Sequence, residues 1–122
     1  MNLQAKVDQL FHSAEQGDWA TFRSAFADDA VFKQNVGPEM AIDDAMPLFP
    51  RHMADGTTLA YENRRLLIGN NSVTETHDAV FRKPDGKEIR LDICVVMQFD
   101  EMGKIVRADE YVDSAAARAL FE

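Results

Sequence analysis

The chain has 122 residues, of which 46% are apolar, and its 21 acidic and 13 basic residues give a formal net charge of -8. A chain of this length can bury a core without disulfides or a structural metal, so we expect a single domain over residues 1–122. The acidic balance argues against nucleic acid or an anionic membrane as a partner, because both are bound through clustered lysine and arginine.

The sequence carries no signal for a membrane or for secretion. No apolar run approaches the roughly 20 residues that span a bilayer, and residues 1–6 lack the charged and then apolar pattern of a secretory leader. We therefore expect a soluble, cytoplasmic protein. The single cysteine, Cys94, cannot form an intramolecular disulfide, and a cysteine-based zinc site within one chain is excluded.

The first third of the chain has the apolar spacing of helices. A stripe of apolar residues predicts an amphipathic helix that ends at Gly17. Its members are Leu3, Val7, Leu10, Phe11 and Ala14. Asp18 is a suitable N-cap for a second helix, which we expect to end at residues 28–29. The apolar face of that helix would consist of Trp19, Phe22 and Phe26. Residues 30–36 are predicted to form the first strand.

The middle of the chain is interrupted by prolines. Residues 42–53 keep a helical spacing, but Pro47 and Pro50 imply either a kinked helix or two short helices that end near Gly56. After Gly56 the period becomes that of strands. The predicted strands are residues 58–68, 73–83, 88–99 and 104–113, and residues 114–122 are predicted to form a helical tail. Short connections rich in turn residues make consecutive strands antiparallel partners.

Helices followed by a long antiparallel meander are typical of an α+β fold. Strands of about ten residues curl because sheets twist, and a curled sheet closed by the N-terminal helices would enclose a cavity, which is the candidate site. In the last strand, Glu110 shares a face with Val106, Ala108 and Val112. A carboxylate among small apolar side chains is a candidate for acid/base chemistry.

Residues 88–99 form the most apolar strand. One face carries Leu91, Ile93, Val95, Met97 and Phe99, and the other carries Cys94, Val96 and Gln98. Both faces are largely apolar, unlike those of a sheet with one side in water. We expect the first face to line the core or the cavity and the second to be covered by another subunit, which predicts a homodimer.

Three groups of residues carry a resemblance to a known family. They are Gly17-Asp18-Trp19 between the first two helices, residues 26–32 at the entry to the first strand, and Gly103-Lys104-Ile105 with residues 110–113 at the end. Together they resemble the nuclear transport factor 2-like superfamily and its SnoaL-like branch, which includes polyketide cyclases, ketosteroid isomerase and limonene epoxide hydrolase. The resemblance covers nearly the whole chain. It implies a cone-shaped curled sheet around helices, an apolar pocket at the open end, and homodimers formed through the outer sheet face.

The resemblance also allows the functional residues of family members to be compared with this chain position by position. The base of ketosteroid isomerase falls at Gln34, and its oxyanion-binding tyrosine falls at Leu10. A glutamine cannot abstract a proton and a leucine cannot donate a hydrogen bond, so the mechanism of that isomerase is not supported.

Limonene epoxide hydrolase gives a closer correspondence. Its water-holding positions fall at Phe32, Gln34 and Glu110, with His77 in place of an arginine and Ala79 in place of the proton-donating aspartate. Three of these positions remain polar. A protonated His77 could act as the acid in place of the missing aspartate, since imidazole titrates near neutral pH.

The resemblance therefore implies a site composed of Glu110, His77 and Gln34. Their predicted roles are general base or water holder for Glu110, acid or oxyanion donor for His77, and hydrogen-bonding orienter for Gln34. Burial would raise the pKa of Glu110, and a protonated His77 would lower it. Such a protein would isomerise, cyclise or add water to a small apolar or carbonyl-bearing molecule without a cofactor. Two alternatives remain open: a non-catalytic ligand-binding or dimerisation module, and an accessory domain for protein partners.

The remaining polar residues receive simpler assignments. Glu75 and Asp92 are expected at solvent-facing or edge positions, and His12 and His52 are expected on the surface. His77, His52 and Glu110 could in principle ligate a metal, but no ligand spacing supports such a site, and we expect none.

Overall fold

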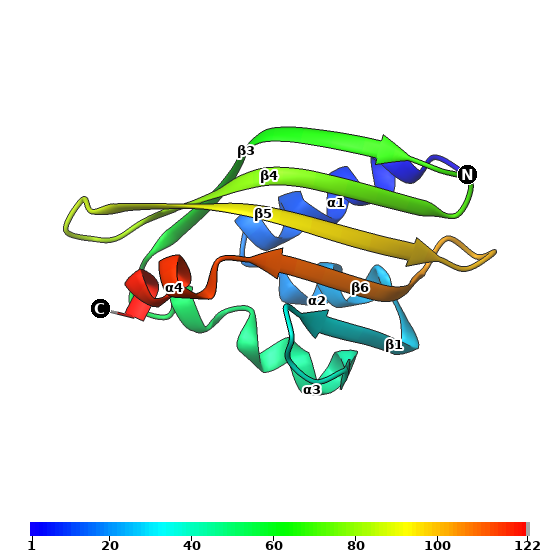
Figure 1. Ribbon diagram of the computed structural model, residues 1–122, viewed down its shortest axis with the longest axis horizontal. Coiled ribbons are helices and arrows are strands. Elements are labelled where there is room, and N and C mark those ends of the chain that lie inside the picture. The colour runs from blue at the N-terminus through cyan, green and yellow to red at the C-terminus, as the bar shows by residue number, and fades with distance from the viewer. Residues whose placement is uncertain (122) are drawn as a thin grey trace.

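The computed structural model describes residues 1–121 and has the predicted α+β cone fold. One curled, unclosed sheet of six strands has the order β2-β1-β6-β5-β4-β3, and the N-terminal helices α1 and α2 lie behind it in Figure 1. β1 and β6 are parallel, and the other neighbouring strands are antiparallel. No described helix is long and apolar enough to cross a membrane.

The elements follow the predicted order. The helical elements are α1 (Leu3–Glu15), α2 (Trp19–Ser24), α3 (Ile42–Ala45), α4 (Ser114–Ala117) and 3₁₀ turns at Met46–Leu48, Arg51–Met53 and Arg118–Phe121. The strands are β1 (Phe26–Gln34), β2 (Met40–Ala41), β3 (Thr58–Ile68), β4 (Ser72–Arg82), β5 (Glu88–Phe99) and β6 (Ile105–Val112). Strands β3 to β6 match the predicted bounds to within one residue at each end. The helical segment before Gly56 is divided into short pieces. Glu122, the last residue of the predicted tail, lies outside the described residues.

Two residues identified from the sequence set the boundary between the first two helices. Gly17 ends α1 with a φ of +68°, in the left-handed region that glycine adopts without strain. Asp18 then caps α2, because its carboxylate accepts a hydrogen bond from the Thr21 backbone N–H at 3.1 Å. Both assignments are confirmed.

The predicted boundary between α2 and β1 is wrong. The helix ends at Ser24 rather than at residues 28–29, and β1 begins at Phe26 rather than at residue 30. The backbone after Ser24 pairs outside the helix: the Ala25 carbonyl accepts from the Ile105 N–H at 2.9 Å, and Arg23 donates a hydrogen bond to the Phe26 carbonyl at 3.1 Å. Phe26 is buried in the strand as it would be in a helix, so its apolar character could not distinguish the two conformations.

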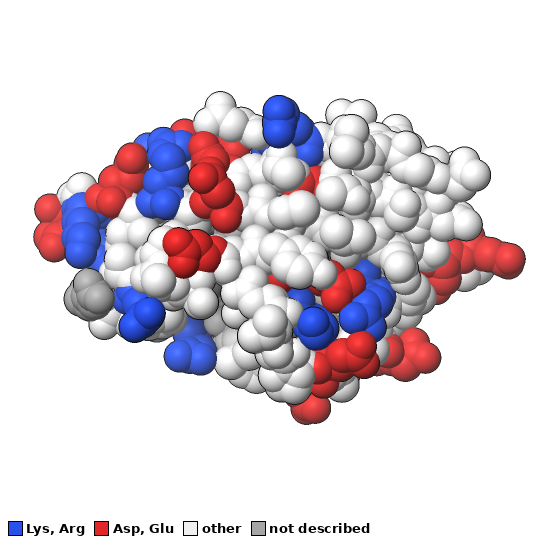
Figure 2. Space-filling model, in the orientation of Figure 1, with Lys and Arg blue, Asp and Glu red and all other residues white. Residues whose placement is uncertain are grey.

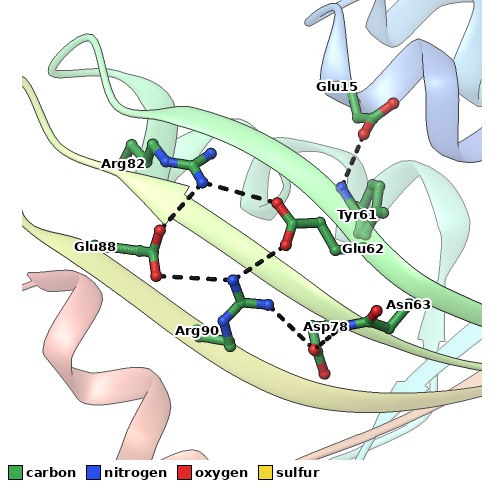
Figure 3. Close-up of polar contacts among 8 residues, drawn as sticks. All are labelled: Glu15, Tyr61, Glu62, Asn63, Asp78, Arg82, Glu88 and Arg90. Carbon is green, nitrogen blue, oxygen red and sulfur yellow. Dashed lines mark hydrogen bonds and ion pairs between the residues drawn. The ribbon is translucent and has the colours of Figure 1, made fainter.

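A bulge in β3 changes which side chains face inward. The pairs that flank it are Glu62 with Asp78 and Arg65 with Thr76. Asn63 and Arg64 therefore stand together opposite the single residue His77. Asn63 has a φ of +54°, and its side-chain amide donates to Asp78 at 2.8 Å (Figure 3). The extra residue directs Arg64 toward the interior, where it reaches Glu75.

The core consists of two hydrophobic clusters. The helix-side cluster packs α1 and α2 against the sheet, and its buried members include Val7, Phe11, Phe22, Phe32, Met97 and Ala108. The tail-side cluster consists of Leu59, Ala79, Phe81, Ile89, Leu91 and Leu120. The C-terminal tail closes the tail-side cluster, because Leu120 is buried there and its carbonyl accepts a hydrogen bond from Lys83 Nζ at 2.7 Å.

Candidate functional site

A cavity of about 290 Å³ extends along the inner face of the sheet and is lined by residues of both clusters. Most of its wall is apolar. The polar side chains that line it are Gln34, Arg51, His52, Tyr61, His77 and Glu110. Small-molecule sites usually measure about 300–1,000 Å³, so this cavity suits a small ligand.

Glu110 and Gln34 form a hydrogen-bonded pair in the cavity wall. They are directly opposite each other in the parallel β1–β6 pair, and Gln34 Nε2 donates to Glu110 Oε1 at 2.6 Å. Burial raises the pKa of Glu110, while the hydrogen bond from Gln34 and the field of His77 oppose the rise without cancelling it. Glu110 is therefore a carboxylate of raised basicity, oriented by Gln34.

His77 lines the same cavity from β4, and Glu75 fixes its ring. Their side chains are 1% and 0% exposed, and His77 Nδ1 lies 2.6 Å from Glu75 Oε2. A carboxylate can only accept a hydrogen bond, so the Nδ1 nitrogen carries a proton. In the neutral ring Nε2 is then an acceptor; it has no hydrogen-bond partner among residues 1–121, and the His77 side chain lines the cavity.

The prediction that Glu75 faces solvent or an edge is wrong. Arg64 binds its carboxylate through two hydrogen bonds, of 3.0 Å from Nε and 2.9 Å from a terminal nitrogen, and Arg64 also pairs with Asp8 at 2.9 Å. Burial raises the pKa of Glu75, but the hydrogen bonds from His77 and Arg64 outweigh it and hold the pKa below its ordinary value. Alternation placed Glu75 on the face of His77, but nothing in the sequence revealed the bulge that supplies Arg64.

Tyr61 is a site residue that sequence reasoning missed. Its ring lies beside His77, with the ring centroids 4.6 Å apart, and its backbone N–H donates to Glu15 at 2.8 Å (Figure 3). Burial, followed by the negative charge of Glu110, raises the pKa of Tyr61, so the phenol keeps its proton and can donate a hydrogen bond at neutral pH. The alternation of β3 could have located it, because Tyr61 follows the inward-facing Leu59 by two residues.

The other polar residues divide between the surface and the cavity. His12 and Asp92 are exposed, as expected. His52 is half-buried rather than fully on the surface: it lines the cavity with its ring centroid 4.7 Å from that of Phe81, and burial, with the nearby charge of Arg51, lowers its pKa. The described residues contain no group of three or more histidine, cysteine or acidic side chains arranged to hold a metal ion.

The structure thus brings the three predicted site residues into one cavity. Gln34 and Glu110 touch, whereas His77 reaches the cavity from β4, two strands away from β6 in the sheet. Tyr61 and His52 line the same cavity, and Glu75, held by Arg64, supports His77 from outside its lining. Chemically, the arrangement offers a basic carboxylate, an imidazole with one free nitrogen and a protonated phenol around an apolar space.

Comparisons with known proteins place this geometry in a family. Residues 7–108 match the family described as SnoaL-like domain. Solved structures with a similar fold include a candidate polyketide cyclase from Xanthomonas campestris pv. campestris, with 17% identity, a TM-score of 0.81 and coverage of 98% of this chain and 96% of that chain. They also include an LEH-like epoxide hydrolase from M. tuberculosis (16% identity, TM-score 0.75, coverage 95% and 86%). A third is IdmH, a candidate polyketide cyclase from Streptomyces antibioticus (15% identity, TM-score 0.81, coverage 99% of both chains).

The structural similarities are at low sequence identity and establish the fold alone. No curated protein matches the chain in sequence. The family match is of a different kind, because it extends over most of the chain. The chain belongs to the SnoaL-like domain family.

Proposed function

We propose that the protein is a small cofactor-independent enzyme that performs acid/base chemistry on an apolar, carbonyl-bearing molecule. The observation that carries this proposal is the carboxylate of Glu110, whose pKa is raised, facing the same apolar cavity as His77 Nε2. Perturbed carboxylates in apolar cavities are frequent in catalytic sites. The names of the structural neighbours, which include polyketide cyclases and an epoxide hydrolase, agree with chemistry of this kind.

Each group has a role in the proposed reaction. Glu110 removes a proton from the carbon next to the carbonyl, and the bonding electrons move to form the enolate. Gln34 holds Glu110 in position. The developing negative charge on the carbonyl oxygen is met by the Tyr61 hydroxyl and by His77 Nε2 when the imidazole is protonated. Return of the proton to a different carbon gives an isomer, and attack of the enolate on a second carbonyl of the same molecule gives a ring.

Glu75 orients the ring of His77. It accepts the Nδ1 proton in both charge states of the ring, so a protonated His77 presents its second proton through Nε2. The Arg64 side chain balances the charge of Glu75 and keeps the carboxylate ionised. This arrangement fixes the ring of His77 beside the apolar cavity.

Exchange of ketone α-protons for deuterium, followed by NMR in D₂O, tests the proposal without knowledge of the natural substrate. With dibutyl ketone as the probe, we expect exchange above the buffer rate, and a loss of about 100-fold or more in Glu110→Gln. Glu101→Gln is the matched control, because Glu101 is exposed in the turn before β6. Exchange at the buffer rate, with affinity for the ketone retained, would favour the alternative of a ligand-binding module.

A further inference from the structure

Glu110 and His77 lie between the two apolar ends of the cavity. Along β6, Ala108 belongs to the helix-side cluster, Glu110 follows, and Val112 packs against the tail-side cluster. Along β4, His77 stands between Val73 of the helix-side cluster and Ala79 of the tail-side cluster. The same order on two strands places Glu110 and His77 at the boundary of the clusters.

The apolar regions on either side of this boundary are long enough to hold parts of one ligand. Strand residues rise about 3.3 Å each, so Ala108 and Val112 stand about 13 Å apart with Glu110 midway. On β5, which pairs with both polar strands, Met97 lies in the helix-side cluster and Leu91 in the tail-side cluster, and both line the cavity. A ligand that fills the cavity therefore contacts apolar side chains of both clusters and meets Glu110, His77 and Tyr61 near its middle, while Arg51 and His52 line the tail end.

The polar groups also need a partner when the cavity fills. Tyr61 packs against both clusters and lines the cavity, and its protonated hydroxyl has no hydrogen-bond partner among the described residues. A hydrocarbon segment placed against it would remove its access to water and give no hydrogen bond in return, which is unfavourable. An oxygen placed there satisfies it, and the apolar ends of the same molecule bury the two clusters.

We infer that the cavity selects molecules that carry a carbonyl oxygen in the middle of an apolar skeleton, rather than at its end. This inference rests on the proposed function and names its substrate class. A ligand with a terminal carbonyl can accept a hydrogen bond from Tyr61 only by leaving one cluster unfilled. A terminal carboxylate would in addition bring negative charge toward Glu110, unless it reached Arg51 at the tail end.

Binding of isomeric ketones tests the inference on the unmodified protein. Dibutyl ketone and heptyl methyl ketone have the same composition and differ only in whether the carbonyl is central or near one end. Trp19, the single tryptophan, lines the cavity and reports binding by fluorescence. We expect dibutyl ketone to bind about fivefold more tightly or better, the effect of one net hydrogen bond. In Tyr61→Phe the preference should fall toward unity, while Glu101→Gln keeps it.

Equal affinities, or a preference for heptyl methyl ketone, would overturn the inference, and so would an absence of binding by both ketones. Nonanoate that binds more tightly than dibutyl ketone would also overturn it, since the charged end would then be held at Arg51. These outcomes are distinguishable from failure of the proposed function. Equal affinities with Glu110-dependent proton exchange reject only the central-carbonyl rule, whereas a clear preference without exchange rejects only catalysis.

Discussion

Glu75 Oε2 lies 2.6 Å from His77 Nδ1, and both side chains are almost wholly removed from solvent. The two residues are separated by one position on β4, so the strand itself sets their spacing. A buried carboxylate held by an arginine and an imidazole fixes which nitrogen of that imidazole meets the cavity. This relationship leads to the first prediction.

Replacing Glu75 by glutamine should remove the preference of His77 for the tautomer that carries its proton on Nδ1. In the unmodified protein we expect ¹⁵N NMR to find the proton on Nδ1 at neutral pH, and in Glu75→Gln we expect a mixture of tautomers. Ketone exchange should fall about 100-fold, the lower range for loss of a positioned acid. Glu88→Gln, at the exposed start of β5, is the control. A neutral His77 with its proton on Nε2 in the unmodified protein would show that Glu75 does not position the ring.

Replacing Arg64 by methionine should destabilise the fold, because it leaves Glu75 buried without its main partner. Removal of one member of a buried ion pair costs about 3–5 kcal/mol of unfolding free energy. Arg65→Met is the matched control, since Arg65 is exposed on the next position of β3. Urea unfolding of the two variants measures the difference. Equal midpoints would mean that the Arg64–Glu75 pair contributes nothing.

The same pair predicts a loss of stability in acid. The folded pKa of Glu75 lies below its ordinary value of 4.5, so the unfolded chain binds more protons over this range. The contribution of Glu75 is therefore complete above pH 4.5 and is lost as the pH falls through the folded pKa. We expect Arg64→Met to weaken this acid dependence in urea titrations between pH 3 and pH 7. A pH dependence of the same size in both proteins would contradict the assignment.

Glu110 should have the opposite effect on stability. Its folded pKa is raised, so the folded protein binds more protons and its stability falls as the pH rises from 4.5 through the folded pKa. Glu110→Gln removes this penalty and can keep an amide contact with Gln34. We expect its melting temperature to rise by a few degrees at pH 7 while exchange activity is lost. A lower melting temperature at pH 7 would show that the ionised carboxylate stabilises the fold.

We propose that two copies associate through the outer face of the sheet. Figure 2 shows an uncharged area over the central and right-hand part of this face, while charged side chains gather toward the left end and the lower edge. Cys94 and Val96 lie on the outer face of β5 and are half-buried, and Leu67 and Tyr111 are 75% and 49% exposed.

Val96→Glu should convert a dimer to a monomer of 13.7 kDa in light scattering. Val36→Glu, at a fully exposed position in the β1–β2 turn, should leave the dimer intact. A monomeric unmodified protein at micromolar concentration would contradict this proposal.

Ion pairs at one end of the β3–β5 hairpins form a boundary of the uncharged area on the outer face of the sheet. Arg82 and Arg90 connect Glu62, Asp78 and Glu88 across three strands (Figure 3). Such exposed pairs add little to stability individually. Their charges disfavour burial, so an interface should stop short of them.

The strands could be predicted because their signals are local. The change of period at Gly56 and the turn residues between strands fixed β3 to β6 within one residue. The boundary of α2 and β1 could not be predicted, because Phe26 is buried in either conformation. The contact of Gln34 with Glu110 depends on a parallel pairing between strands 76 positions apart, which only the family resemblance indicated.

The surroundings of Glu75 and the position of His52 could not be predicted from the sequence. A bulge depends on how two strands fit together, so the sequence of β3 did not reveal that Arg64 turns inward to neutralise Glu75. His52 lies near the end of the proline-interrupted segment (residues 42–53), whose path over the tail-side cluster is set by tertiary packing. Tyr61, in contrast, follows directly from strand alternation.

The pH dependence of ketone exchange tests the central claim most directly. Dibutyl ketone exchange in the unmodified protein should increase as Glu110 ionises, with an inflection above pH 4.5. In Glu110→Gln that inflection should disappear and the rate should approach that of buffer. An identical profile in both proteins would show that Glu110 is not the base.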